Sequence, residues 1–362
     1  MLFRHASKIV MIAILSSALL IALLPARESD ALRATHLDRT KVAGGCAVCH
    51  KGHGKRATVM LAMPKDDLCL SCHGQSAGGS QGRTDVSSAI VKRSSHGSMQ
   101  ASQNHVFGSR LPENSSISQR NVSCFDCHNA HKSENGNALK GMQGYSGRGT
   151  AIKSARNEYE VCYRCHADEG NPAQEEANVA LDFAPSNASF HPVEKFGKNS
   201  HVPSLKKGYS RSSLITCSDC HGNDDASGPK GPHGSIYEPI LKYQYIRTAG
   251  PEGLRAYELC YSCHNRSSIL DDESFKYHKI HVVYNQVSCA QCHDAHGSRS
   301  NLSLIKFDET VVFPNSNGEL TYLPMVQGQP RCYLSCHVRG RPYEHKLDKF
   351  LNYSINGRRT QK

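Results

Sequence analysis

The sixteen cysteines of the chain form eight close pairs, and a histidine directly follows every pair. Seven pairs read Cys-x-x-Cys-His, whereas the eighth, from Cys332 to His337, has three residues between its cysteines. Histidine makes up 21 of the 362 residues, so its presence after all eight pairs has a chance probability on the order of 10⁻¹⁰. The histidine is therefore part of the motif. The cysteines are Cys46, Cys49, Cys69, Cys72, Cys124, Cys127, Cys162, Cys165, Cys217, Cys220, Cys260, Cys263, Cys289, Cys292, Cys332 and Cys336, and the histidines are His50, His73, His128, His166, His221, His264, His293 and His337.

Three kinds of chemistry use paired cysteines. Exported proteins use them for disulfides, and repeated Cys-x-x-Cys pairs often hold zinc, but neither use requires the adjacent histidine. Covalent c-type haem does require it, because two thiols bond the haem vinyl groups while the next imidazole binds the iron from the same side. Two intervening residues also put both sulfurs on one face of a short helical turn. The sequence therefore predicts eight covalent haem c groups, and the wider eighth motif departs from the usual spacing.

Twelve further histidines remain for the far sides of the irons once His5 is lost with the N-terminal segment. They sort into three sets of four. The upstream set precedes each pair of motifs and the trailing set follows the first motif of each pair; together these eight are the first choice for distal ligands. The members are His36, His105, His201 and His281 upstream, His53, His131, His233 and His296 trailing, and, as alternates after each second motif, His96, His191, His278 and His345.

A trailing histidine must serve a neighbouring haem, because a three-residue connection is too short to pass around the porphyrin of its own motif. The fifth motif delays its trailing histidine to His233, which leaves the ligation there open. Methionine is the other common axial ligand, but the few methionines beyond the N-terminal segment cannot complete eight sites. Ligation by two histidines predicts low reduction potentials, since it is methionine that raises them.

The elements that position these residues repeat along the chain. Odd-numbered motifs follow a small or hydroxylated residue, as in VSC and ITC, and even-numbered motifs follow helix-favouring stretches such as KDDLC and NEYEVC. The chain is thus predicted to contain four haem doublets, at residues 32–95, 96–190, 191–275 and 276–362, the last with a C-terminal tail. A repeat whose units contact their neighbours predicts an elongated array. The segment from Thr310 to Gln327 is expected to form a hairpin at its Asn-Gly turn.

The composition agrees with a fold built around cofactors. Only 38% of the residues are hydrophobic and tryptophan is absent, so a conventional core is poorly supplied, and porphyrin faces would replace it. The predicted fold class is mostly irregular, with short α-helices and little β structure. The formal net charge of +11 is expected to compensate haem propionates and does not indicate a nucleic-acid surface.

The N-terminal segment has the layout of a secretory signal peptide. Arg4 and Lys8 precede an uncharged run from Ile9 to Leu24, and a polar stretch ends at Ala31. We expect residues 1–31 to be removed on export to the periplasm or cell surface; an uncleaved membrane anchor is the alternative. No other apolar run is long enough for a polytopic membrane protein.

The stretch YHKIHVVYNQVSCAQCHDAHGS, from Tyr277 to Ser298, resembles the doubled-CxxCH multihaem cytochromes, a family with class III-like relatives. The resemblance covers nearly all of residues 36–345 and implies electron transfer between closely spaced, six-coordinate haems in the periplasm or on the cell exterior. The supply of histidines predicts that no iron position is left open, and hence a carrier and not an enzyme. The motifs are not specific for any physiological partner; the partners we expect are other redox proteins, namely multihaem cytochromes or a quinol-oxidising membrane complex. Two alternatives remain open: a reductase of a small oxyanion such as nitrite, and a subunit of a polymeric cytochrome filament.

Overall fold

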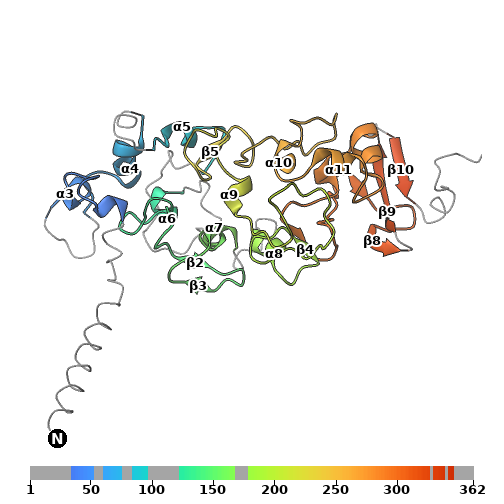
Figure 1. The fold of residues 1–362 in the computed structure, drawn as a ribbon, viewed down its shortest axis with the longest axis horizontal. Helices are drawn as coiled ribbons and strands as arrows, with labels where there is room; N and C mark the ends of the chain where they lie inside the picture. The colour runs from blue at the N-terminus through green and yellow to red at the C-terminus, as the bar shows by residue number, and fades with distance from the viewer. Residues whose placement is uncertain are drawn as a thin grey trace, which may run out of the picture.

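The computed structural model describes residues 34–52, 60–75, 84–96, 122–167, 178–326, 329–338 and 341–345. Over these residues the molecule is elongated, and the chain advances from one end to the other, from α3 to β10 (Figure 1). Within the described part of the chain, no helix is long and apolar enough to cross a membrane. The expected signal segment, residues 1–31, lies outside the described residues.

The helices are short and separated by long irregular stretches, as the sequence predicts. Most of them carry a cysteine motif or adjoin one. They are η1 (Thr35–Leu37), α3 (Cys46–Cys49), α4 (Lys65–His73), α5 (Ser87–Ile90), α6 (Cys124–Cys127), α7 (Glu158–His166), α8 (Val179–Phe183), α9 (Cys217–Cys220), α10 (Glu258–Tyr261), α11 (Arg266–Leu270), the π-helix η4 (Lys279–Tyr284) and the 3-10 helix η5 (Cys289–Gln291).

In the described residues, the β structure consists of three two-stranded ladders and one four-stranded sheet, all antiparallel. The ladders pair β1 (Ser94–Ser95) with β5 (Gly234–Ser235), β2 (Gly144–Tyr145) with β3 (Ala151–Ile152), and β4 (Ser189–Phe190) with β6 (Gly297–Ser298). The sheet lies at the C-terminal end and contains β7 (Val312–Phe313), β8 (Thr321–Val326), β9 (Gln329–Val338) and β10 (Arg341–His345).

The hairpin expected within Thr310–Gln327 is wrong in its pairing. A tight turn does form there, with the Gly318 N–H donating to the Asn315 carbonyl at 2.9 Å and Gly318 at φ 77°. However, the strands on either side of that turn, β7 and β8, each pair with β9 and not with each other. The turn signal marked a local reversal correctly but could not identify the strand that supplies the hydrogen bonds.

Two small clusters form the protein core in the described residues. One gathers Tyr163, Ala167, Ala180, Phe183 and Val193, and the other Ala256, Tyr257, Tyr261, Leu270 and Val282. Each packs beside cysteine motifs, with Cys217 at the edge of the first cluster and Cys260 and Cys289 at the edge of the second. The apolar protein core is therefore small and lies next to the motifs, as the composition predicts.

Candidate metal centres

We number the candidate centres as sites 1 to 8 in chain order, each defined by one cysteine pair and its following histidine. In sites 1 to 7 the motif lies on a helical turn, provided by α3, α4, α6, α7, α9, α10 and η5 in that order. This is the geometry that brings two thiols to one face of the backbone. Site 8 differs, because Cys332 and Cys336 lie within the extended strand β9.

The residue before most odd-numbered motifs caps the motif helix. The backbone N–H of Ser123 donates to the Asp126 carboxylate at 2.7 Å, and that of Thr216 donates to Asp219 at 2.7 Å. Ser288 repeats the arrangement with Gln291 at 2.9 Å. These capping boxes account for the hydroxylated residue that precedes the odd motifs, since they stabilise helices too short to persist unaided.

An acidic side chain at the start of an even motif helix binds the start of the next odd motif helix. Asp66 of α4 accepts from the Ser123 hydroxyl at 2.7 Å and from the Cys124 N–H at 3.1 Å. Glu158 of α7 accepts from the Ser218 N–H at 2.6 Å and from its hydroxyl at 2.7 Å. Sequence reasoning missed this role, although KDDLC and NEYEVC both carry the acid three or four residues before the cysteine.

These links bring consecutive motifs together. The thiols of Cys69 and Cys124 are hydrogen-bonded neighbours, and so are those of Cys162 and Cys217 and those of Cys260 and Cys289. Within doublets, the thiols of site 5 approach those of site 6, and those of site 7 approach site 8. The sites therefore follow one another in space in their chain order.

The thiols form neither disulfides nor a four-cysteine zinc site, although those of Cys162 and Cys217 lie within 4.8 Å of each other and of the Glu158 carboxylate. All sixteen cysteines are free. Among the described residues, which include every cysteine, no four thiols converge as a four-cysteine zinc site would require. Burial raises the pKa of Cys127 to about 11 and that of Cys220 to about 12, so these thiols stay protonated and are not reactive thiolates.

Seven of the eight motif histidines face a second histidine that belongs to no motif. The ring centroids of each pair lie 5.9 to 6.5 Å apart. Two imidazoles bound to opposite sides of one iron, at about 2 Å per bond, would have their centroids about 6 Å apart. In site order the pairs are His50 with His131, His73 with His36, His128 with His233, His166 with His96, His221 with His296, His264 with His191 and His293 with His278.

The facing pairs fall into two groups. Sites 1, 3 and 5 each face the trailing histidine of the following doublet, and the two ring planes lie within 24° of each other. Sites 2, 4 and 6 each face a histidine that precedes their own doublet, and the ring planes are 54 to 61° apart. Site 7, which has no following doublet, faces His278 at 42°.

Two of the short ladders position the facing histidines in pairs. His96 follows β1 and His233 precedes its partner β5, while His191 follows β4 and His296 precedes β6. In addition, the His96 Nδ1 donates to the carbonyl just before His233, at 2.8 Å, and the His191 Nδ1 donates to the carbonyl just before His296. Each ladder thus holds one histidine for an odd site and one for an even site.

The His-Gly-Ser strings at 233–235 and 296–298 have a structural role at these ladders. A Cβ on Gly234 would lie 2.0 Å from the Ala89 carbonyl oxygen, and one on Gly297 would lie 2.0 Å from that of Asp182. The following serine is buried in both strings, and its hydroxyl donates to a backbone carbonyl at 2.6 Å. Glycine allows the close approach and serine fastens the loop, so the histidine before them is fixed in direction.

The hydrogen bonds of the imidazoles leave Nε2 for a metal. Nδ1 bonds a backbone carbonyl in His73, His128, His221 and His293 among the motif histidines, at 2.9 to 3.1 Å. A carbonyl only accepts, so Nδ1 carries the proton and Nε2 keeps its lone pair. Burial lowers the pKa of His264, His233 and His278 to about 4, which keeps these rings neutral, the form that binds metals. The thiol pairs, the facing imidazoles and their tautomers fit covalent haem.

Some predicted ligands do not lie in facing pairs. Of the upstream set, His201 is exposed and faces no other described histidine ring. His281 stacks on Phe275 with centroids 6.1 Å apart, and its Nδ1 donates to the Tyr277 carbonyl at 2.6 Å. Three of the alternates, in contrast, do face motif histidines. The expectations for His53 and His105, and for the side chains of His337 and His345, lie outside the residues described.

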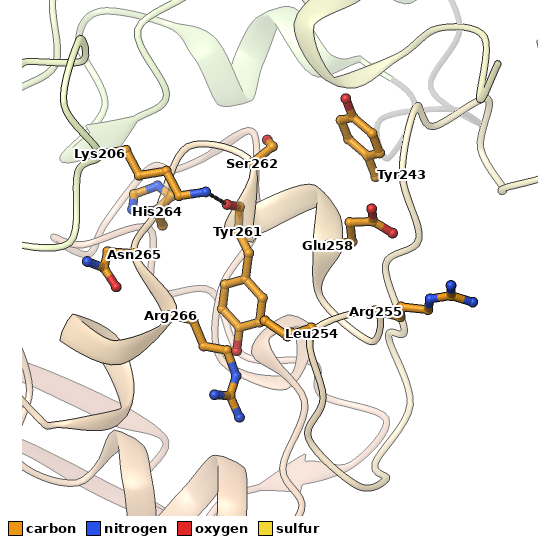
Figure 2. A pocket seen from close by; sticks show the side chains of 10 residues that line it. All are labelled: Lys206, Tyr243, Leu254, Arg255, Glu258, Tyr261, Ser262, His264, Asn265 and Arg266. Atoms are coloured by element: carbon orange, nitrogen blue, oxygen red, sulfur yellow. Dashed lines mark hydrogen bonds between the residues drawn. The ribbon is translucent and has the colours of Figure 1, made fainter. Parts of the chain in front are cut away.

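A cavity of about 590 Å³ adjoins site 6 (Figure 2). Its wall includes Glu258, Tyr261 and Ser262 of the motif segment, together with His264. Residues 258, 261 and 262 share one helix face, and neither cysteine of the motif lines the cavity. The cavity therefore lies on the face of α10 turned away from the thiols.

Comparison with known proteins agrees with this geometry. A family model described as outer membrane cytochrome MtrC/MtrF-like, domains II/IV, matches residues 145–305. A second, described as doubled CXXCH motif, matches residues 40–78 and 118–171. No curated protein and no solved structure matches the chain. Over these segments the chain is similar to multihaem c-type cytochromes of the doubled-CxxCH type.

Proposed function

We propose that the protein is an octahaem electron carrier, exported to the periplasm or the cell surface, that passes electrons along a row of low-potential haems between redox partners. The observation that supports this most directly is the set of seven facing histidine pairs. An iron held by two imidazoles has no open position for a substrate, so seven sites are built to exchange electrons and not to bind reactants.

Each chain component has a separate role in this proposal. The sixteen cysteines attach the haems, the eight motif histidines bind the irons on the near side, and seven histidines bind on the far side: His36, His96, His131, His191, His233, His278 and His296. The far-side ligand of site 8 is drawn from His53, His105, His201, His281 and His345. When bound, haem supplies a one-electron exchange between ferric and ferrous iron.

The order of the sites supports transfer along the molecule. The thiols of sites 2 and 3, 4 and 5, and 6 and 7 are in contact, so haems attached there would lie close together. The trailing histidines add a second connection, because His128 and His131 stand three residues apart and serve sites 3 and 1. The four predicted doublets, 32–95, 96–190, 191–275 and 276–362, would then be consecutive segments of one conductor.

The partners that fit this proposal are other redox proteins. The match to an outer membrane cytochrome model over residues 145–305 favours multihaem cytochromes at the cell surface as partners, with a quinol-oxidising complex as an electron source. The basic excess of the polypeptide is offset by propionates in the loaded protein, so no nucleic-acid partner is proposed. Membrane attachment would require an uncleaved N-terminal segment.

Low-temperature EPR of the oxidised holoprotein tests the proposal. We expect low-spin signals from at least seven haems, together with no rapid binding of carbon monoxide by those sites after reduction. Rapid carbon monoxide binding at one haem, combined with turnover of nitrite or hydroxylamine, would replace the carrier with a reductase. A long polymer at physiological protein concentration, seen by electron microscopy, would instead favour a cytochrome filament.

A further inference from the structure

Sites 5 and 6 are neighbours with unlike surroundings at the outer edges of their imidazoles. At site 5 the Nδ1 of His296 lies 3.4 Å from the Asp294 carboxylate, and His221 donates to the Pro239 carbonyl at 2.9 Å. At site 6 the Nδ1 of His264 lies 2.9 Å from the Ser204 hydroxyl. In the other motif histidines whose Nδ1 bond is described, the partner is a backbone carbonyl.

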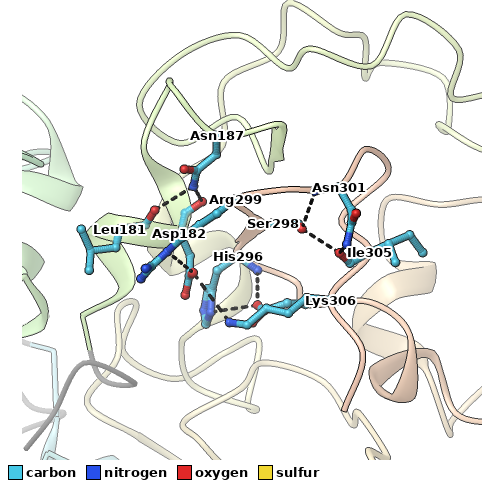
Figure 3. Close-up of polar contacts among 10 residues, drawn as sticks. Leu181, Asp182, Asn187, His296, Ser298, Arg299, Asn301, Ile305 and Lys306 are labelled. Atoms are coloured by element: carbon cyan, nitrogen blue, oxygen red, sulfur yellow. Dashed lines mark hydrogen bonds and ion pairs between the residues drawn. The ribbon is translucent and has the colours of Figure 1, made fainter. Parts of the chain in front are cut away.

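The Asp294 carboxylate belongs to a charged network; Figure 3 labels its other members, Asp182, His296, Arg299 and Lys306. Lys306 Nζ lies 2.8 Å from Asp294 and 3.6 Å from Asp182, and Arg299 lies 4.0 Å from Asp182. The Asp294 side chain is 24% exposed, so its charge is only partly screened by solvent. The His296 backbone N–H also donates to the same carboxylate oxygen at 2.9 Å, which holds the carboxylate beside the ring.

The group that faces Nδ1 controls how strongly an imidazole donates to iron. A carboxylate draws the Nδ1 proton more strongly than a carbonyl does, and a hydroxyl draws it less. Stronger withdrawal of that proton makes the imidazole a better donor, which stabilises ferric iron and lowers the reduction potential. Site 5 combines a carboxylate with a carbonyl, whereas site 6 combines a hydroxyl with the Ala295 carbonyl at His191.

We propose that Asp294 and Ser204 are positioning residues that set a potential step within the third doublet, with site 5 the more reducing and site 6 the more oxidising. Electron transfer from site 5 to site 6, and so towards the C-terminal end, is then downhill. The inference rests on the proposed ligation of site 5 by His221 and His296 and of site 6 by His264 and His191.

Substitutions of Asp294 and of Ser204 are expected to change different potentials in a redox titration, those of site 5 and of site 6. Asp294→Asn removes the charge and keeps the side-chain shape, so it raises the potential of site 5; we expect at least a tenfold shift in the ferric-to-ferrous ratio, which is about 59 mV for a one-electron couple. Lys306→Gln removes the cation that neutralises Asp294 and lowers the potential of site 5. Ser204→Ala raises the potential of site 6 by a smaller factor. Ser204→Thr keeps the hydroxyl and leaves that potential unchanged.

The holoprotein variants are titrated electrochemically and followed by EPR, with His296→Ala as the marker that identifies the site 5 signal. Asp308→Asn is the matched control, because that carboxylate bonds only within its own turn, to Thr310. An unchanged site 5 potential in Asp294→Asn, with a spin change still present in His296→Ala, overturns the potential step and leaves the carrier function standing. An unchanged spectrum in His296→Ala itself would instead overturn the ligation on which both depend.

Discussion

The repeating part of the molecule and its C-terminal sheet carry the same motif on different backbones. In sites 1 to 7 the cysteines lie on helical turns, and each motif histidine faces a second imidazole. In site 8 the cysteines are four residues apart in β9, where neighbouring strands take up the backbone hydrogen bonds. Three residues along a helix rise by about 4.5 Å, whereas four residues along a strand span about 13 Å.

The difference shows that sequence spacing alone does not produce a binding geometry. Capping boxes stabilise the helical motifs of sites 3, 5 and 7, and the acids Asp66 and Glu158 of the preceding helices bind those of sites 3 and 5. The eighth motif has neither support. Loading of site 8 by haem therefore requires the segment from Cys332 to His337 to leave its extended conformation.

Paired cysteine variants test most directly whether site 8 carries a haem as site 7 does. Cys289→Ser with Cys292→Ser should lower the mass of the holoprotein by one haem, because both thioether bonds of site 7 are lost. The corresponding pair, Cys332→Ser with Cys336→Ser, should also remove one of eight haems. Denaturing mass spectrometry measures both. If the Cys332→Ser, Cys336→Ser variant has the same haem count as the unmodified protein, then β9 stays extended in the holoprotein and the protein carries seven haems.

A trailing histidine gives the next largest effect. His296→Ala should leave every haem attached, since thioether bonds do not involve it, but should convert site 5 from low spin to high spin and raise its potential. The control is His201→Ala, because His201 is exposed, faces no described histidine and is only one of five candidates for site 8. EPR of both variants distinguishes a ligand from a surface residue, and high-spin signal in the control would show that His201 serves a site.

The ladder that positions His296 predicts an effect on stability. Gly297→Ala places a Cβ against the Asp182 carbonyl and should lower the free energy of unfolding by about 1 to 3 kcal/mol, because the backbones must separate. A Cβ at Gly250 meets nothing within 4 Å, so Gly250→Ala should change stability by less than about 0.5 kcal/mol. Denaturant unfolding of the two holoproteins, followed by circular dichroism, compares them; equal midpoints would contradict the close approach.

The smallest effect requires no variant. Near-parallel imidazoles, as in sites 1, 3 and 5, split the two iron d orbitals that overlap with the ligand π systems and should give rhombic low-spin EPR spectra. The tilted pairs of sites 2, 4 and 6 keep these orbitals close in energy and should give more axial spectra with a larger maximal g value. A single class of low-spin signal would contradict the alternation of ring planes.

The sequence predicted the motifs, the short helices and the scarce core, because these depend on local composition and on spacing within a few residues. It also named His131, His233 and His296 as candidates, and each faces a motif histidine; despite its longer loop, the His233 ring centroid lies 6.1 Å from that of His128. It gave lower rank to His96 and His191, which face His166 and His264 in the structure. Their placement depends on two-residue ladders that no local pattern reveals.

The facing pair of His50 and His131 also has a consequence for assembly. A polypeptide exported from its N-terminus delivers the first motif well before His131 emerges. Likewise, sites 3 and 5 lack their second histidine until His233 and His296 emerge. Each early centre would therefore stay five-coordinate, and open to solvent oxidants, until the next segment arrives. The sites would then be completed in chain order during export, because each newly translocated doublet supplies the second histidine for the odd site of the doublet before it.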